Sequence, residues 1–295
     1  MSPSPGPPVI FDTARRTARL KRSARTISNA DFLHARAAGN AVGSLEALLR
    51  DWPEVADLSA HAGAFAAALV ASHASARVGA VKVISDLTAR AGPGAAPLAL
   101  PDQSQDLIVS LISLHWANDL PGALAQIRRA LKPDGLFVGT LLGAGTLKEL
   151  RAVLTEAELE TRGGAQARVS PFADGFDGAA LLQRAGFALP VSDVDRVTVR
   201  YRDLIALIRD LRAMGETNVL AGPTRPLTRP LIARAAALYA ERFAEPDGRI
   251  PATFEIVHLA GWAPHESQQK PLPRGSAKVR LADALGVKEW TGEEP

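Results

Sequence analysis

The stretch from Asp106 to Leu142, DLIVSLISLHWANDLPGALAQIRRALKPDGLFVGTLL, decides the fold of this 295-residue chain. It opens with the strand-like apolar run DLIVSL at 106–111. Residues 118–131 then carry apolar side chains at helical spacing, and KPDG at 132–135 breaks that helix. The apolar run LFVGTLL follows at 136–142. Together these segments form one βαβ unit, which predicts two parallel strands.

Strand-sized apolar runs on both sides of this unit also alternate with helical patterns. In chain order we expect strands at 55–58, 78–84, 191–201 and 253–262, and helices at 62–72, 146–159, 178–185, 204–214 and 229–243. Short apolar strands that alternate with helices favour a sheet covered on both faces. The sequence therefore predicts an α/β fold with a doubly wound, Rossmann-like sheet.

The remaining segments set the expected domain organisation. Residues 1–8, MSPSPGPP, are expected to form a disordered tail, and residues 9–53 a helical lead-in. The main domain is expected over 54–264, with the helical cap inserted at about 202–245. Residues 265–295 are polar and contain prolines, and we expect a tail that wraps around the domain.

Composition excludes several classes of protein. With 47% hydrophobic and 22% charged residues, the chain can bury a core, so wholesale disorder is excluded. The absence of cysteine excludes a disulfide scaffold, a cysteine-ligated cluster and a cysteine nucleophile. A net charge of +3 does not indicate nucleic-acid binding, and we expect no nucleic-acid partner. No run of 18 apolar residues occurs, so we expect no membrane span.

The N-terminal stretch between Arg15 and Arg25 is crowded with basic residues. Two interpretations remain open: a transit peptide, or a solvated basic helix of the mature protein, which we favour. No apolar segment follows Met1, so a secretory signal is not expected. The Arg-heavy, Ala-rich composition leads us to expect a cytoplasmic bacterial protein.

Polar residues follow three of the expected strands. They are DLSAHAG at 57–63, Asp86, and Ser113 to Trp116. In a doubly wound sheet, ligands bind beyond the carboxyl ends of the strands. Turn amides and a helix N-terminus there bind an anionic group, while an acid after the next strand accepts from ribose hydroxyls. The pattern predicts a site for a nucleotide-like ligand.

Longer stretches carry a family resemblance from about Ile10 to Leu285. The run 110–151 and the segment HESQQKPLPRGSA at 265–277 are its most specific parts. They resemble the class I S-adenosylmethionine (SAM)-dependent methyltransferases of the type-11 group, and more closely the complex I assembly-factor methyltransferase and arginine-hydroxylase family. The resemblance implies a seven-stranded sheet whose last strand is antiparallel. It also implies SAM as the cofactor.

The resemblance further implies which residues meet the cofactor. Asp57 and Gly63 match the ends of the family's Asp-Leu-Gly-x-Gly-x-Gly loop, and Asp86 falls where the family places its ribose-binding acid. His115 and Trp116 would line the cofactor or substrate pocket. A second interpretation packs Trp116 on the following helix and pairs His115 with a backbone group.

Two residues depart from the family loop. Ser59 and His61 stand where glycines are expected. Glycine there lets the cofactor approach the backbone, whereas a serine or an imidazole side chain occupies that space. His61 has two interpretations, a catalytic base or an exposed loop residue, and we favour the second. PLALPDQSQDL at 97–107 offers no match for the acid that contacts the adenine amine.

The mouth of a substrate pocket is expected at three loops. They are Gly163–Gly164, Ser170–Phe172 and Met214–Asn218, if the helices at 204–243 cap the sheet. His265 with Glu266 has no third ligand in view, and we expect no metal site. The sequence identifies no catalytic residue.

Three functions remain open. The first is a SAM-dependent enzyme that resembles a complex I assembly factor and acts on an iron–sulfur subunit of the peripheral arm. The second is a pseudo-methyltransferase, an assembly chaperone that does not bind SAM. The third, weaker alternative is a methyltransferase for a small molecule or an acyl carrier. Binding of SAM separates the first two.

Overall fold

The computed structural model describes residues 9–61, 63–84, 98–172, 177–269, 276 and 279–287. The tail expected at 1–8 and the proposed ribose-binding Asp86 lie outside these residues. Within the described part of the chain, no helix has both the length and the apolar character needed to cross a membrane.

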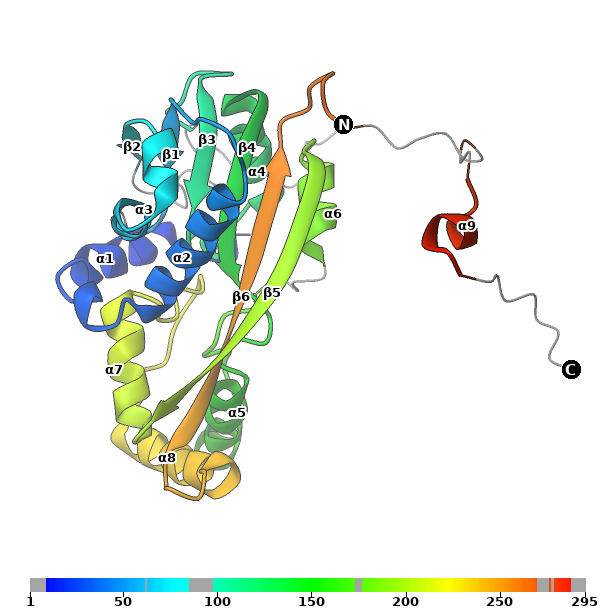
Figure 1. Ribbon diagram of the computed structural model, residues 1–295. Coiled ribbons are helices and arrows are strands. Elements are labelled where there is room, and N and C mark those ends of the chain that lie inside the picture. Colours follow the sequence, from blue (N-terminus) through cyan, green and yellow to red (C-terminus); the bar gives the residue numbers. More distant parts are fainter. Residues whose placement is uncertain are drawn as a thin grey trace, which may run out of the picture. The chain divides into compact units, whose positions relative to one another are not determined.

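A mixed sheet in the order β2-β1-β3-β4-β6-β5 forms the centre of the fold (Figure 1). Strands β1 to β4 pair in parallel, whereas β6 is antiparallel to both β4 and β5. The α/β class and the antiparallel last strand are thus confirmed. The described residues form six of the seven expected strands: β1 Val55–Asp57, β2 Val81–Val83, β3 Gln105–Ser110, β4 Leu131–Leu142, β5 Ala188–Tyr201 and β6 Ile250–Trp262.

The helices begin and end close to the positions that the sequence indicates. Asp119 and Asp203 start two of them, because their carboxylates accept the backbone N–H of Gly122 and Ala206 respectively. The helices are α1 Thr13–Ser23, α2 Phe32–Glu46, α3 Ala64–Val70, α4 Leu120–Ala130, α5 Lys148–Arg162, α6 Gly178–Arg184, α7 Leu204–Met214, α8 Arg229–Phe243 and α9 Leu281–Leu285.

Alternating side chains of the parallel strands supply two hydrophobic cores, one on each face of the sheet. On β3, Leu107 and Val109 join the core beneath α2 and α3, while Ile108 joins the core beneath α4 and α6. Both faces are therefore covered by helices, as a doubly wound sheet requires (Figure 1).

Strands β5 and β6 extend past the parallel strands, and three helices surround this extension (Figure 1). Helix α5 packs on α8 and on β6, and α7 contacts α1 and β5. The segment expected to cap the sheet, about 202–245, contains α7 and α8. This arrangement places α7 between the N-terminal helix and the end of the long strands.

The chain divides into two compact units, residues 1–264 and residues 265–295. The first holds the sheet and both cores. In the second, the Ser267 hydroxyl lies 2.7 Å from Nδ1 of His265, and α9 forms a short helix. The expectation that this tail wraps around the domain stays a prediction. We also expect Arg274 to make defined contacts as part of this tail, and it lies outside the described residues.

Candidate functional site

Asp57 ends β1 and directs its carboxylate into the protein. Its Oδ1 accepts the Ser59 backbone N–H at 2.9 Å and also the Ser59 hydroxyl. The same hydroxyl oxygen accepts the Leu111 N–H at 2.9 Å. Both Asp57 and Ser59 are almost fully buried. Burial raises the pKa of Asp57, while the two bonds from Ser59 oppose that shift. Ser59 thus joins the end of β1 to the residue after β3.

His61 crosses from the loop to the C-terminal end of α7. Its Nε2–H donates to the Met214 carbonyl at 2.8 Å. Its ring meets His34 of α2 edge-on, with 5.0 Å between centroids. The expectation of an exposed loop residue is wrong, because α7 folds over the loop and gives the imidazole a backbone acceptor.

Gly63 is the loop glycine that remains. It has a φ of +109° at the start of α3, a conformation that side chains with a Cβ rarely adopt. A Cβ built there would meet no atom within 4 Å. The backbone conformation, rather than crowding, accounts for glycine at this position.

A buried ionic network links three distant segments. Glu216, directly after α7, accepts Arg16 of α1 at Oε1 (3.0 Å), and its Oε2 accepts His115 Nε2–H and the Trp116 indole N–H, both at 2.9 Å. Arg16 also donates to the Gly215 carbonyl at 2.7 Å and lies over the Trp116 ring. The network ties the N-terminal helix to the sheet.

The charges in this network follow from its geometry. Burial alone would raise the pKa of Glu216, but the Arg16 guanidinium and His115 outweigh it and hold that pKa well below its usual range. Burial lowers the pKa of His115. Its Nδ1 receives the Leu142 N–H at 3.4 Å, so the proton sits on Nε2. Glu216 is an anion whose two oxygens already have partners.

Arg16 corrects one expectation about the N-terminus. The basic stretch is expected to be solvated, yet Arg16 is only 2% exposed. Its charge is compensated by Glu216, which lies 200 positions away in the chain. Spacing within the basic stretch does not reveal this partner.

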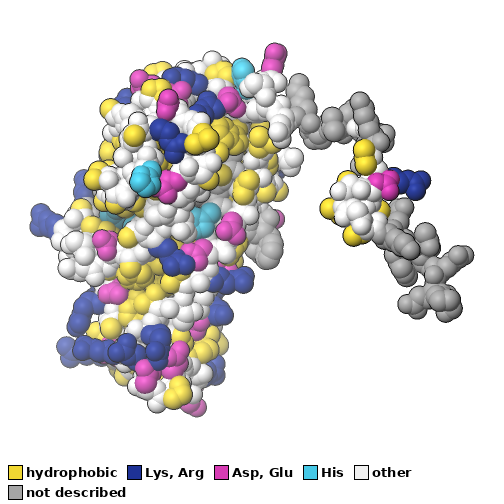
Figure 2. All heavy atoms as spheres, viewed as in Figure 1, with side chains coloured by type: hydrophobic (Ala, Val, Ile, Leu, Met, Phe, Trp, Pro, Cys, Tyr) yellow, Lys and Arg dark blue, Asp and Glu magenta, His cyan; other side chains and the backbone are white. Residues whose placement is uncertain are grey.

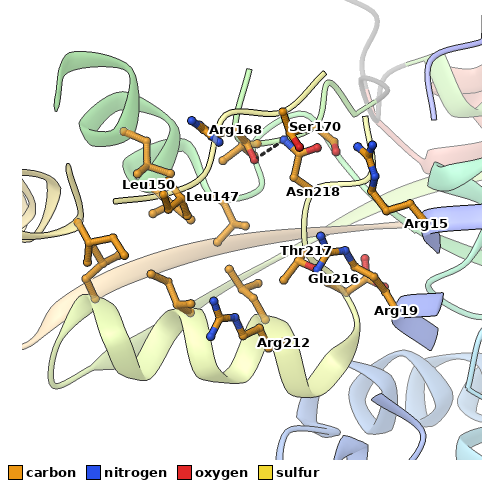
Figure 3. Close-up of a pocket in the computed structure, with 18 of the residues that line it drawn as sticks. Arg15, Arg19, Leu147, Leu150, Arg168, Ser170, Arg212, Glu216, Thr217 and Asn218 are labelled. Carbon is orange, nitrogen blue, oxygen red and sulfur yellow. Dashed lines mark hydrogen bonds between the residues drawn. The ribbon is translucent and has the colours of Figure 1, made fainter. Parts of the chain in front are cut away.

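A cavity of about 360 Å³ lies beside the network (Figure 3). Its wall includes Trp116 and Glu216 but none of Asp57, Ser59, His61 and Gly63. The cavity is thus separate from the loop at the end of β1. The other lining residues are Arg15, Arg19, Leu147, Leu150, Leu154, Arg168, Val169, Ser170, Phe172, Leu204, Ile208, Leu211, Arg212, Thr217, Asn218, Thr224, Arg225, Leu227 and Ile232.

Two of the three loops expected at a substrate mouth meet in this wall. They contribute Ser170 and Phe172 from one loop, and Glu216, Thr217 and Asn218 from the other. Asn218 joins them, since its side-chain amide donates to the Arg168 carbonyl at 3.0 Å (Figure 3). The Gly163–Gly164 loop does not line the cavity.

The contacts of His115 and Trp116 share features with both interpretations, pocket lining and pairing with a backbone group. Trp116 lines the cavity, and its ring packs edge-on against Phe11 and Phe172. His115 pairs with the Leu142 backbone N–H and with Glu216. A role for either in cofactor binding stays a prediction.

The loop at β1 does not offer a SAM molecule the open backbone of a glycine-rich turn. Ser59 and His61 project side chains from two of its three glycine positions, and both are hydrogen-bonded to other segments. The Asp57 carboxylate is already bonded to Ser59. Among the described residues, no group of three or more His, Asp or Glu side chains is placed to hold a metal ion.

The match to a protein-family model agrees with this architecture. Residues 56–139 match the family model for a methyltransferase domain. A putative methyltransferase from Bacillus halodurans aligns with a TM-score of 0.46 at 15% identity, over 76% of this chain and 99% of that one. The chain resembles the class I SAM-dependent methyltransferases.

Curated relatives narrow the resemblance to the complex I assembly-factor family. The mitochondrial arginine-hydroxylase NDUFAF5 of Danio rerio is 46% identical over 186 residues, 63% of this chain and 58% of that protein. The human NDUFAF5 is 44% identical over 63% of this chain and 54% of that protein. A malonyl-[acyl-carrier protein] O-methyltransferase of Halorhodospira halophila is 38% identical over 65% and 62%. The chain thus spans about half the length of the curated relatives it matches.

These relatives correct the expected location. Composition led us to expect a cytoplasmic bacterial protein, whereas the NDUFAF5 relatives from Danio rerio, Dictyostelium discoideum and human are mitochondrial proteins. Arg and Ala content reports on codon usage and helix content in many lineages, so it does not identify a compartment.

Proposed function

We propose that this chain is a methyltransferase-fold assembly protein that binds a subunit of respiratory complex I and does not use SAM. The observation that carries the proposal is the loop after β1, where Ser59 and His61 are hydrogen-bonded into the domain. The methyltransferase fold then serves as a scaffold for a partner surface.

Energetics support the loss of the cofactor. A ligand amine at the end of β1 competes with Ser59 for Asp57, and a ligand beside the loop displaces the bond from His61 to Met214. One hydrogen bond to a charged group contributes about 1.5–3 kcal/mol, and a neutral one about 0.5–1.5 kcal/mol. Two lost contacts together weaken a micromolar site by about 30- to 2,000-fold, which reaches millimolar at the upper end.

The partner is proposed from the resemblance. The NDUFAF5 relatives are named arginine-hydroxylases. The resemblance to the complex I assembly-factor family implies an iron–sulfur subunit of the peripheral arm as the protein acted upon. We propose the same subunit as the partner of this chain. Hydroxylation of an arginine is less well supported. Five arginines line the cavity, and Glu216, the one acid among its described lining residues, is already fully paired.

SAM-dependent methyl transfer is the second candidate. It is favoured by the match to the methyltransferase domain model and by retention of Asp57 and Gly63. The two candidates differ in whether the purified chain binds SAM.

Titration calorimetry with SAM is the deciding experiment. We expect the wild-type chain to bind more weakly than about 1 mM, and the Ser59→Gly/His61→Gly variant to recover part of the affinity. A matched control is His73→Gly/Ser75→Gly, which removes the same side chains from exposed positions between α3 and β2. Low-micromolar binding by the wild type would overturn the proposal in favour of the enzyme.

Partner binding is tested separately. We expect the chain to form a stable complex with the purified iron–sulfur subunit in the absence of SAM, measured by size-exclusion chromatography with light scattering. Adding SAM should leave the complex unchanged. Failure to form any complex contradicts the assembly role even if the loop does not bind SAM.

A further inference from the structure

One end of the cavity is apolar. Leu147 and Leu150 line it at the start of α5 (Figure 3). Leu154, further along α5, also lines it, and α7 and α8 supply the opposite wall. The residues of that wall are Leu204, Ile208, Leu211 and Ile232. This end can remove a hydrocarbon chain from water, and burial of apolar surface stabilises binding.

The other end is strongly basic. Arg15 and Arg19 reach it from α1, and Arg212 reaches it from α7 (Figure 3). Within the described residues, the side chains of Arg19 and Arg212 have neither an acidic partner nor a hydrogen-bond acceptor. Burial, followed by repulsion from Arg22, Arg15 and Arg212, lowers the pKa of Arg19. Cations gathered in this way favour an anion among them.

Two buried donors of the cavity wall have no partner among the residues that the structure describes. The Ser170 hydroxyl and Nε of Arg19 are both buried, and neither has a hydrogen-bond acceptor within the described residues. Ser170 is only 3% exposed. An unpaired buried donor destabilises the free protein, and an acceptor oxygen on a ligand removes that cost.

The acid in the wall does not offset this basic end. Both Glu216 oxygens are bonded, to Arg16 on one side and to His115 and Trp116 on the other. A cationic ligand therefore meets arginines and no available carboxylate among the described lining residues. The chemistry of the wall selects an anion.

We propose that this cavity binds a single-chain amphipathic anion. Its carboxylate or phosphate head lies between Arg19 and Arg212 and accepts from Ser170, and its hydrocarbon chain lies between α5 and α7. The proposal concerns a cavity separate from the loop after β1, so it does not depend on whether that loop binds SAM.

The test is titration of the full chain with four ten-carbon probes below their micelle concentrations. They are decanoate, decyl phosphate, decanol and decyltrimethylammonium. We expect the two anions to bind at least about tenfold more tightly than decanol, and the cation not to bind. Decanoate and decyl phosphate together distinguish a free carboxylate from a phosphate head.

Variants locate the site. Arg19→Gln/Arg212→Gln should weaken decanoate at least about tenfold while leaving decanol unchanged. Its matched control, Arg25→Gln/Arg184→Gln, removes the same charge from exposed arginines that do not line the cavity. Ser170→Ala should weaken decanoate without lowering the melting temperature of the free chain, because the deleted hydroxyl has no partner in the described part of the chain.

Three results would overturn the proposal. The first is equal binding of all four probes, which indicates unspecific apolar contact. The second is equal loss of affinity in the test and control arginine variants. The third is no binding of either anion while a peptide of alternating Glu and Leu binds, which assigns the cavity to a segment of a protein partner.

Discussion

At the scale of the residue, two side chains of the loop after β1 stand where the family has glycines. Each of them forms hydrogen bonds with other parts of the domain. Ser59 replaces a glycine, and its hydroxyl provides an acceptor for Leu111 N–H and a donor for Asp57. His61 replaces a second glycine, and its Nε2–H donates to the Met214 carbonyl. Ser59 thus occupies an oxygen of the Asp57 carboxylate, and His61 places an imidazole where the family loop has a glycine.

Glu216 is the residue whose loss should cost most stability. Glu216→Ala leaves the buried Arg16 charge and the donors of His115 and Trp116 unpaired. Removal of one partner from a buried ion pair lowers the free energy of unfolding by about 3–5 kcal/mol. Urea denaturation measures this change. The control Glu160→Ala breaks the exposed pair with Arg234 and should change little, so equal losses would contradict the prediction.

His34 should make stability depend on pH. Burial and the neighbouring His61 lower its pKa from 6.5 to about 3, so between these values the unfolded chain binds a proton that the folded chain does not. Stability is therefore complete above pH 6.5 and falls as the pH falls. From pH 7 to 5 we expect this residue to account for a loss of about 2 kcal/mol.

The variant His34→Phe removes this contribution and should flatten the fall in stability between pH 7 and 5. Lowered pKa values of His61 and His115 act in the same direction, while the raised pKa of Asp57 acts in the opposite one. Chemical denaturation at both pH values measures the slope. The exposed His73→Phe is the control, and an unchanged slope in His34→Phe would contradict the assignment.

At the scale of the element, the N-terminal segment is an integral part of the domain. Asn118 Oδ1 accepts the N–H groups of Ile10 and Phe11, both at 2.8 Å, and its amide donates to the Phe11 carbonyl. Phe11 also pairs with Leu220 in an isolated bridge. These bonds position α1 so that Arg16 reaches Glu216.

Asn118→Ala should loosen this segment. The variant leaves the backbone of the buried Phe11 without its partner, at a cost of about 1–3 kcal/mol. Hydrogen exchange at the amides of Ile10 and Phe11 should accelerate, while exchange in β3 stays slow. Asn29→Ala, at an exposed position, serves as the comparison. Unchanged exchange at both amides would show that Asn118 does not hold the segment.

At the scale of the whole molecule, both hydrophobic cores belong to the unit that ends at Pro264. Lysines and arginines lie on the surface around α7 and α8 (Figure 2). The sheet, its two covered faces and the cavity are thus complete within one unit.

A chain ending at Pro264 tests the role of the tail. We expect it to fold, because both cores are retained, and to melt at a lower temperature, because the tail motif is too specific for a linker. Circular dichroism on the full and shortened chains measures both. A melting temperature equal to that of the full chain would contradict a stabilising tail.

Local patterns of the sequence were sufficient to predict most of the strands and helices of the fold. Strand-sized apolar runs such as 106–111 and 136–142, with the breaker at 132–135, predicted the parallel unit. The KPDG segment at 132–135 was expected to lie between the helix and the next strand. It lies inside β4 instead, because β4 already begins at Leu131. Backbone pairing with a neighbouring strand extends a strand through residues that only interrupt a helix.

The sequence by itself determined the α/β class and the helix positions, because these depend on short-range periodicity. Its resemblance to the methyltransferase family identified Ser59 and His61 as the two departures in the loop. Only the tertiary structure decided which polar groups meet. Arg16, His115 and Glu216 are far apart in the chain, and Arg19 and Arg212 face one cavity because α1 and α7 pack together. Long-range pairing depends on helix packing, which no local pattern encodes, so the ionic network and the basic cavity become visible only in three dimensions.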